Sequence, residues 1–360
     1  MQAFSLKTTI ISGAGAIDAL STLGCQRLFL VTDPYFEKNG TVQKVAQAAK
    51  AQAVEIFSEV EPDPSVSLAA RGTARLKAFG ADSVIALGGG SAMDCAKAMV
   101  YFAKGNHRLI AIPTTSGSGS EVTDFAILTH DKVKHPLIDG SIRPDYAILD
   151  SDLLEALPKS LIADTGFDVL AHALEACCAR DAGVLSDLYA KEAFRYAYAA
   201  LPASYAGKKE VRLKVHMAAT MAGIAFSQAG LGLCHAISHS LGGIFHVPHG
   251  RLNAIVLPAV IGCNAHAAIR KYAELARAAG MGGSADTIAL RNLKNGLIRL
   301  RQELELPHTL AQAGIPSRAL WAQMNSIVES TLADPCCSTN PVTVDDFLVR
   351  RLLEEVAGRG

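Results

Sequence analysis

The sequence predicts an α/β amino-terminal domain built on a mostly parallel sheet, followed by an all-α carboxy-terminal domain. In the first 150 residues, short runs of Val, Ile and Leu alternate with segments of helical period, as in strands covered by helices on both faces. After Asp150 the strand signals nearly vanish, and Ala- and Leu-rich helical patterns continue along the chain. We therefore predict two domains, 1–154 and 155–360.

Each element is predicted from a short apolar run or a helical period. Apolar and β-branched runs predict strands at 8–12, 28–32, 54–57, 83–87 and 109–112. Helices between them are predicted at 42–52, 66–79 and from about 91 to 104. In the second domain the predicted helices are 159–179, 184–200, 208–228, 234–243, 251–280, 284–303 and 343–356.

Composition narrows the class of protein. Half of the 360 residues are apolar, so the chain can bury a large core. The formal net charge is zero and no long run of Lys or Arg occurs, which argues against nucleic acid or an anionic membrane as partner. Lys7 lies where the apolar core of a secretory signal would have to be, which argues against such a signal. The apolar stretch 252–269 contains Asn, Pro and His, which argues against a membrane-spanning helix. We expect a cytoplasmic protein without a membrane span.

The eight cysteines show no CxxC spacing, which argues against a zinc finger or a redox motif. Two adjacent pairs, Cys177–Cys178 and Cys336–Cys337, are poorly placed to form disulfides within themselves. Without a secretion signal we expect all eight as reduced thiols.

Two glycine-rich loops follow predicted strands and suit a nucleotide. Residues 88–91 (GGGS) end one strand and open a helix, where glycines let a diphosphate approach backbone N–H groups. Residues 113–120 (PTTSGSGS) offer hydroxyls for phosphate and ribose. The alternatives are a tight turn without ligand for the first loop and an N-cap cluster of a following helix for the second.

Asp33 ends the strand 28–32, where a carboxylate can accept hydrogen bonds from the ribose hydroxyls and repel a 2′-phosphate. This favours NAD over NADP. The acid precedes the glycines here, so the order differs from the usual GxGxxG arrangement.

Histidines concentrate between residues 230 and 258. They are His235, His239, His246 and His249. Asp168 and His172 lie four residues apart, as do His235 and His239, so each pair shares a helix face. A carboxylate with imidazoles suits Fe²⁺ or Zn²⁺. A single histidine on an apolar helix is usually a core residue, and spacing alone leaves open which histidines bind a metal.

Five long motifs resemble the iron-dependent (group III) alcohol dehydrogenases, and the resemblance extends over the full length. They are GGGSAMDCAK (88–97), PTTSGSGSEVT (113–123), TGFDVLAHALEA (165–176), AFSQAGLGLCHAISHSLGG (225–243) and PHGRLNAIVLP (248–258). The resemblance implies a Rossmann-like NAD(H)-binding domain, a helical metal-binding domain and an active site in the cleft between them.

The resemblance also implies roles for individual residues. The metal ligands would be Asp168, His172, His235 and His249, with iron as the ion and zinc as the alternative. His239 would be a catalytic proton relay, and Phe226 and Cys336 would line the substrate channel. With Asp33, the residues expected around the cofactor are Gly89, Gly90, Ser91, Asp94, Thr114, Thr115, Ser118 and Lys134.

Within the family, the chain looks most similar to the propanol dehydrogenases of bacterial propanediol and ethanolamine utilisation. The expected reaction is metal-assisted hydride transfer between NAD(H) and a short aldehyde or primary alcohol such as propanal or acetaldehyde. The likeness implies a homodimer or larger homo-oligomer, in the cytoplasm or inside a bacterial microcompartment with its shell or a companion aldehyde enzyme as partner. The chain differs from many members of the family at His246, Ser240 and Arg251, and in the adjacent Cys336 and Cys337.

Three alternative functions stay open, and the first keeps the scaffold but changes the substrate. A polyol dehydrogenase would act on glycerol, a propanediol or lactaldehyde. A dehydroquinate-synthase-like lyase would need a multiply charged substrate, against which the apolar Phe226, Leu231, Leu233 and Ile244 argue. A non-catalytic nucleotide- or metal-binding protein would not need the complete set of candidate ligands.

Overall fold

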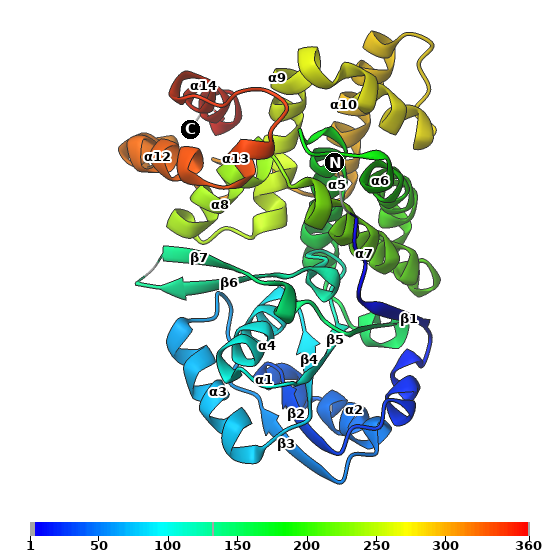
Figure 1. Cartoon of the computed structure of the whole chain (residues 1–360). Helices are drawn as coiled ribbons and strands as arrows, with labels where there is room; N and C mark the ends of the chain where they lie inside the picture. The colour runs from blue at the N-terminus through cyan, green and yellow to red at the C-terminus, as the bar shows by residue number, and fades with distance from the viewer. Residues whose placement is uncertain (1–3, 132, 359–360) are drawn as a thin grey trace. The chain divides into compact units, whose positions relative to one another are not determined.

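The computed structural model describes residues 4–131 and 133–358 (Figure 1). These residues divide into two compact units. We call residues 5–157 the sheet unit, and residue 4 together with 158–358 the helical unit.

The sheet unit contains a parallel sheet of six strands in the order β1-β8-β5-β4-β2-β3. The strands are β1 (Thr9–Gly13), β2 (Arg27–Val31), β3 (Ala53–Phe57), β4 (Ser83–Gly88), β5 (Arg108–Pro113) and β8 (Tyr146–Asp150). Every residue of β4 is buried, as expected for a central strand covered on both faces. The predicted fold class is confirmed.

Helices cover both faces of this sheet because alternate side chains of each strand point to opposite sides. Phe29 and Val31 belong to one core cluster, whereas Leu28 and Leu30 belong to another. The first cluster includes residues of α3 (Val66–Phe79) and α4 (Gly90–Ala103). The second includes residues of η1 (Ala16–Thr22) and α2 (Thr41–Ala49), and α1 (Pro34–Lys38) follows β2.

Residues 125–150 were not predicted to form strands, and the structure places three there. Besides β8, strands β6 (Phe125–His130) and β7 (Val133–Ile138) pair antiparallel as a separate hairpin. The alternative reading of 113–120 as an N-cap cluster is met only by Ser118, whose Oγ accepts from the backbone N–H of Ser120 at 3.3 Å. The next element is the short 3-10 helix η2 (Ser120–Val122), and its N-cap Gly119 makes no side-chain hydrogen bond. Two further 3-10 turns, η3 (Gly140–Ile142) and η4 (Ser151–Leu154), flank β8.

The helical unit confirms the predicted long helices and adds short ones. The long helices are α5 (Lys159–Cys178), α6 (Val184–Tyr205), α7 (Arg212–Ala229), α8 (Leu233–Phe245), α9 (His249–Ala278), α10 (Asp286–Glu303) and α14 (Asp346–Ala357). The 3-10 turn η5 (Lys209–Val211) precedes α7, and the helices α11 (Ser317–Ala322), α12 (Met324–Ala333) and α13 (Cys336–Thr339) were not predicted.

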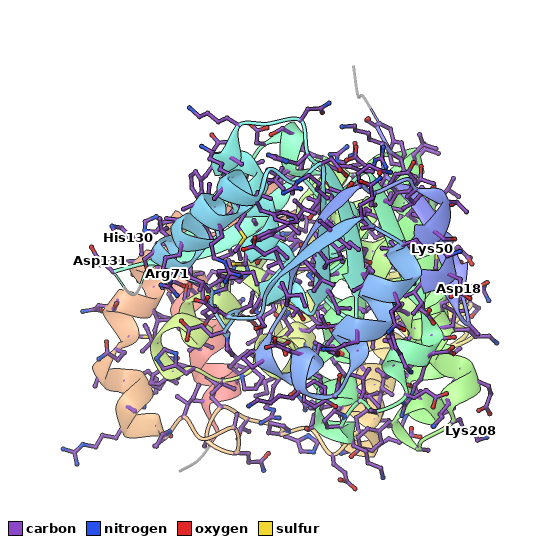
Figure 2. All side chains as sticks on the ribbon, turned by 90° about the horizontal axis from the view of Figure 1, so that it is seen from below. Asp18, Lys50, Arg71, His130, Asp131 and Lys208 are labelled. Atoms are coloured by element: carbon purple, nitrogen blue, oxygen red, sulfur yellow. The ribbon has the colours of Figure 1, made fainter. Side chains whose placement is uncertain are left out.

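Helix α9 has the length and composition of a membrane span. However, 67% of its most apolar window is buried within the protein, as in the core helix of a globular domain. The eight cysteines are free. Charged side chains such as Asp18, Lys50 and Lys208 project outward from the ribbon (Figure 2).

Candidate active site

The first donor groups of the site lie one turn apart on α5. Asp168 and His172 share a helix face, and both are buried. His172 Nδ1 lies 3.9 Å from Asp168 Oδ2. The structure thus brings the predicted carboxylate–imidazole pair together inside the helical unit.

Helices α8 and α9 bring two more imidazoles to the same carboxylate. The Nε2 atoms of His235 and His249 each lie 3.6 Å from Asp168 Oδ1. Donor atoms of Asp168, His172 and His235 all lie within 4.8 Å of one another, a spacing that could hold one metal ion. The ring of His249 lies beside them, with its centroid 5.2 Å from that of His235.

The close approach of α9 to α5 depends on a glycine. A Cβ atom placed on Gly250 would lie 1.9 Å from the carbonyl oxygen of Asp164 and 3.1 Å from Cβ of Asp168. No side chain fits in that space without moving the backbone. The glycine after His249 therefore lets the imidazole sit beside the carboxylate of α5.

Glu175, to which the sequence analysis gave no role, orients His235. Its carboxylate accepts a hydrogen bond from His235 Nδ1 at 2.6 Å. It also accepts from the backbone N–H groups of Gly232 and Cys234 at the start of α8, at 3.0 and 2.7 Å. Because Nδ1 is used in this bond, Nε2 is the atom left for a metal. Glu175 lies two turns after Asp168, so its position on the same helix face was a readable signal.

Asn253, also missed, lies one turn after His249 on α9. Its side-chain nitrogen donates to Asp168 Oδ1 at 2.7 Å and lies 3.0 Å from His249 Nε2 and 3.3 Å from His235 Nε2. The amide therefore contacts three of the candidate metal ligands.

The charges of the cluster suit a cation. Burial of Asp168 by itself would raise its pKa, but the neighbouring imidazoles, led by His172, hold that pKa well below its usual range. Burial also lowers the pKa of His249 well below its usual range. Burial alone would lower the pKa of His235, but its bonds to Asp168 and Glu175 raise that pKa to about 9. A metal binds the ionised carboxylate and neutral imidazoles, so its binding would displace the proton of His235.

His239 lies beside the buried donors, and its partner is Asp334. Its ring stacks on that of His249 with centroids 4.9 Å apart, and its Nδ1 donates to Asp334 Oδ2 at 2.8 Å. Burial would raise the pKa of Asp334, but the bond with His239 and the backbone N–H of Cys336 lower it to about 2. Asp334 was not found in the sequence because no regular spacing links it to α8.

The two residues expected near substrate both lie at this cluster. The ring of Phe226 stacks on His172 with centroids 4.7 Å apart. Cys336 offers its sulfur within 4.8 Å of donor atoms of His239 and Asp334. His246, the additional histidine, is exposed at the end of α8.

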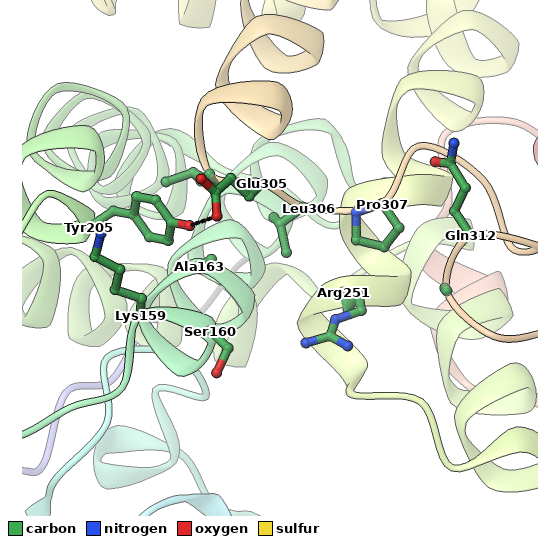
Figure 3. A pocket seen from close by; sticks show the side chains of 11 residues that line it. Lys159, Ser160, Ala163, Tyr205, Arg251, Glu305, Leu306, Pro307 and Gln312 are labelled. Atoms are coloured by element: carbon green, nitrogen blue, oxygen red, sulfur yellow. Dashed lines mark hydrogen bonds between the residues drawn. The ribbon is translucent and has the colours of Figure 1, made fainter.

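A separate cavity of about 530 Å³ lies in the helical unit (Figure 3). Lys159, Tyr205, Arg251 and Glu305 are among its lining residues. Arg251 makes two bonds to the buried Asp164, of 3.0 Å from Nε and 2.9 Å from Nη2. Arg251 therefore connects α9 to α5 through Asp164, which lies one helical turn before Asp168.

In the sheet unit, Asp33 and the two glycine-rich loops lie at the carboxyl ends of β2, β4 and β5, which are neighbours in the sheet. A Cβ on Gly89 would lie 3.3 Å from Thr115 Oγ1, and one on Gly90 would lie 3.5 Å from Cβ of Ser118. Gly88 has φ +148°, and a Cβ there would lie 2.7 Å from Cβ of Ala92. The two loops therefore face each other, with Ser91 in the first turn of α4 and Thr114 directly after β5.

Asp33 has a structural role at this edge. Its Oδ1 accepts from the backbone N–H groups of Tyr35 and Phe36, at 2.9 and 3.4 Å, as the N-cap of α1. Its Oδ2 would lie 3.8 Å from a Cβ on Gly88. The carboxylate is thus beside the glycine loop while it caps a helix.

Asp94 and Lys134 make contacts within the protein. Ser120 Oγ donates to Asp94 Oδ1 at 3.3 Å, and buried Lys97 donates to Ser120 and Thr123. Burial raises the pKa of Asp94 to about 6. Lys134, on the hairpin strand β7, pairs with Asp63 at 2.6 Å. The bonds of Asp94 and Lys97 to Ser120 connect the second loop to α4.

Two models of one protein family match this chain. The family model "Iron-containing alcohol dehydrogenase" matches residues 7–151, and the C-terminal model of the Fe-containing alcohol dehydrogenase family matches 162–357. The chain belongs to the iron-containing alcohol dehydrogenase family and is an oxidoreductase.

Individual relatives span the whole chain. It is 39% identical to a 1-propanol dehydrogenase of Citrobacter freundii, over 99% of this chain and 100% of the relative. It is 34% identical to an NADPH-dependent butanol dehydrogenase of Clostridium saccharobutylicum, over 98% and 97%. Among solved structures, an iron-containing alcohol dehydrogenase of Thermococcus thioreducens superposes with a TM-score of 0.91 at 32% identity, covering 98% of this chain and 99% of that one.

Proposed function

We propose that this protein is an NAD(H)- and iron-dependent dehydrogenase that interconverts short primary alcohols and aldehydes, with reduction of propanal or acetaldehyde as its main reaction. The observation that carries the proposal is the buried donor set of Asp168, His172 and His235, completed by His249. A carboxylate with imidazoles is a suitable donor set for ferrous ion, and zinc is the alternative.

Four residues hold the metal in this proposal, and two others hold the ligands. Asp168, His172, His235 and His249 supply the donor atoms, Glu175 fixes the Nδ1 proton of His235, and Asn253 donates to Asp168. When bound, the ion supplies Lewis acidity at the substrate oxygen, and the nicotinamide supplies or accepts the hydride.

His239 moves the proton in this proposal. Its Nδ1 donates to Asp334, so Nε2 is the atom that exchanges a proton with the substrate oxygen. Asp334 orients the ring through this bond, as a carboxylate does for a catalytic imidazole in other enzymes. Phe226 and Cys336 line the substrate channel beside it.

The nucleotide is assigned to the loops at the carboxyl ends of β4 and β5. Gly89, Gly90 and Ser91 would contact the diphosphate at the start of α4. Further contacts with the NAD(H) molecule are assigned to Asp94, Thr114, Thr115, Ser118 and Lys134. The free oxygen of Asp33 favours NAD over NADP. A sulfoacetaldehyde reductase of Bifidobacterium kashiwanohense, solved with NAD⁺, superposes with a TM-score of 0.90 at 25% identity.

A polyol dehydrogenase is the second candidate. It is favoured by a solved 1,3-propanediol oxidoreductase that superposes with a TM-score of 0.93 at 28% identity. The apolar side chain of Phe226 beside His172 favours a substrate without further hydroxyl groups. We therefore place monofunctional aldehydes first.

Anaerobic turnover tests the proposal. Apo protein reloaded with Fe²⁺ or Zn²⁺ is supplied with NADH and with propanal, acetaldehyde or 3-hydroxypropanal. We expect metal-dependent loss of NADH absorbance, with the largest kcat/KM for propanal. Preference for 3-hydroxypropanal would support the polyol candidate. Absence of turnover despite NADH binding and stoichiometric metal would reject a dehydrogenase acting on these aldehydes.

The proposal includes a homodimer or larger homo-oligomer in the cytoplasm or in a bacterial microcompartment. The likeness to a 1-propanol dehydrogenase of Salmonella typhimurium, 39% identical over 99% of this chain, is the observation behind the proposed location. Sedimentation equilibrium tests the oligomer, and co-purification with shell proteins from the native cell tests the location.

A further inference from the structure

A second group of metal-binding side chains adjoins the buried set. Donor atoms of His239, Asp334 and Cys336 lie within 4.8 Å of one another, and all three residues are partly exposed. The group joins α8 to the start of α13, and none of its members is among the four ligands assigned above. The first set contains nitrogen and oxygen donors, whereas this one adds a sulfur.

We propose that His239, Asp334 and Cys336 form a second, inhibitory site for a thiophilic divalent cation such as Zn²⁺ or Cd²⁺. Three protein ligands of the types N, O and S leave a fourth tetrahedral position for water, as in open zinc sites. Thiolate ligation selects such ions over Mg²⁺ or Ca²⁺. A divalent ion with one carboxylate and one thiolate gives a neutral site, which suits its partial burial.

The existing hydrogen bonds hold the group together in the absence of this ion. His239 Nδ1 is 2.8 Å from Asp334 Oδ2, and the backbone N–H of Cys336 donates to Asp334 Oδ1 at 2.8 Å. Asp334 therefore fixes both neighbours.

Occupation would stop turnover without displacing iron. The imidazole that the proposed reaction uses as proton relay would become a metal ligand, and the thiol near the substrate would be held beside it. Inhibition should therefore follow occupancy of this second site. The inference can be tested by binding alone, so its outcome is separate from that of the proposed reaction.

Cys337 provides a matched control for Cys336. It is the adjacent residue, but its Sγ donates to the carbonyl oxygen of Thr331 at 3.0 Å. Cys234, the cysteine next to His235, is fully buried, with its Sγ 3.4 Å from Asn253 Oδ1. Comparing Cys336→Ser with Cys337→Ser distinguishes specific cation binding by Cys336 from nonspecific cation binding by any thiol of the chain.

The experiment titrates the iron-loaded protein with Cd²⁺ under anaerobic conditions. The Cd–thiolate charge-transfer absorption reports sulfur ligation, and iron content is measured at each point. We expect one equivalent of Cd²⁺ to bind with retained iron in the parent and in Cys337→Ser. Cys336→Ser should lose the absorption and bind Cd²⁺ more than about tenfold more weakly. Asp334→Asn, checked for folding by circular dichroism, should also weaken binding.

Turnover gives the second measurement. Zn²⁺ added to the iron-loaded protein should inhibit the parent and Cys337→Ser with the first added equivalent. Cys336→Ser should retain most of the rate that the same variant shows without added zinc. Equal Cd²⁺ affinity and equal absorption in Cys336→Ser and the parent would overturn the proposal. So would stoichiometric release of iron as the only effect of Cd²⁺, because the ion would then occupy the first set.

Discussion

The carboxylate of Glu175 holds His235 by its Nδ1 at 2.6 Å and, at the same time, caps the first turn of α8 through the backbone N–H of Cys234. One buried side chain therefore fixes both the ring of a proposed ligand and the helix that carries it. Removal of such an outer contact typically lowers metal affinity about 10- to 100-fold.

Glu175→Gln should weaken metal binding about 10- to 100-fold, because a neutral amide stabilises the imidazole less than a carboxylate does. Competition with a fluorescent chelator measures the affinity. Glu274→Gln is the control, since Glu274 pairs with Lys191 at the surface. Equal affinities of the two variants would contradict the orienting role of Glu175.

His249→Ala should lose bound metal and turnover together, because the imidazole at the start of α9 lies 3.6 Å from Asp168. Metal content by mass spectrometry and NADH oxidation are measured on the same sample. His246→Asn is the control. His246 has φ +54°, a conformation that Asn tolerates, and its side chain is exposed. Stoichiometric metal in His249→Ala would mean that the assigned ligand set is wrong.

Asp33→Asn and Asp33→Gly should both raise kcat/KM with NADPH relative to NADH, since each removes the charge that would repel a 2′-phosphate. Only Asn retains a side-chain oxygen to cap α1, so Gly should cost a few tenths of a kcal/mol more in stability. Initial rates with both nucleotides and thermal unfolding separate the two roles. An unchanged nucleotide ratio in both variants would leave Asp33 with only its capping role.

Asp94→Asn should change how stability depends on pH between about 4 and 6. Burial raises the folded-state pKa of Asp94 to about 6 from 3.8. The folded state then binds a proton more tightly than the unfolded state, so this group stabilises at low pH and its contribution is lost as pH rises through 6. The difference in unfolding free energy, parent minus variant, should fall by up to about 1.4 kcal/mol per pH unit. Urea unfolding at several pH values measures it, and a difference independent of pH would contradict the shift.

Arg251→Leu should destabilise the protein by about 1–3 kcal/mol, because it removes the guanidinium that donates two hydrogen bonds to the buried Asp164 carboxylate. This loss of stability is smaller than for a fully buried ion pair because the Arg251 side chain is 30% exposed. Combining it with Asp164→Leu should recover part of the loss. Chemical unfolding of the two single variants and the double variant measures the coupling, and strict additivity would show that the pair contributes nothing as a pair.

Strong periodic segments could be predicted from the sequence, whereas the hairpin could not. Helix α5 was predicted almost to the residue, since its apolar pattern continues over twenty residues. Strand β7 contains Pro136, a residue that strand patterns disfavour, and within 4–131 and 133–358 it pairs with β6 alone. Helices α11 to α13 are too short for a periodic pattern to identify.

The candidate site shows the same division between what local spacing predicts and what it does not. Residues at helical spacing, such as Asp168 and His172, could be paired from the sequence, and Glu175 and Asn253 continue the same faces. Asp334 could not be found, because it reaches His239 only through the tertiary packing of α8 and α12 (Met324–Ala333). Local spacing identifies side chains on one helix, but contacts between distant segments require the folded chain.

Eight free thiols leave α5, α8 and α9 without a covalent link among them. A divalent ion bound to Asp168, His235 and His249 would provide that link, joining three helices that are distant in sequence. A ligand that binds only the folded state stabilises it by mass action. The lifetime of the iron-loaded protein against thermal inactivation should therefore depend on chelators and on dissolved iron, and should be insensitive to thiol reductants.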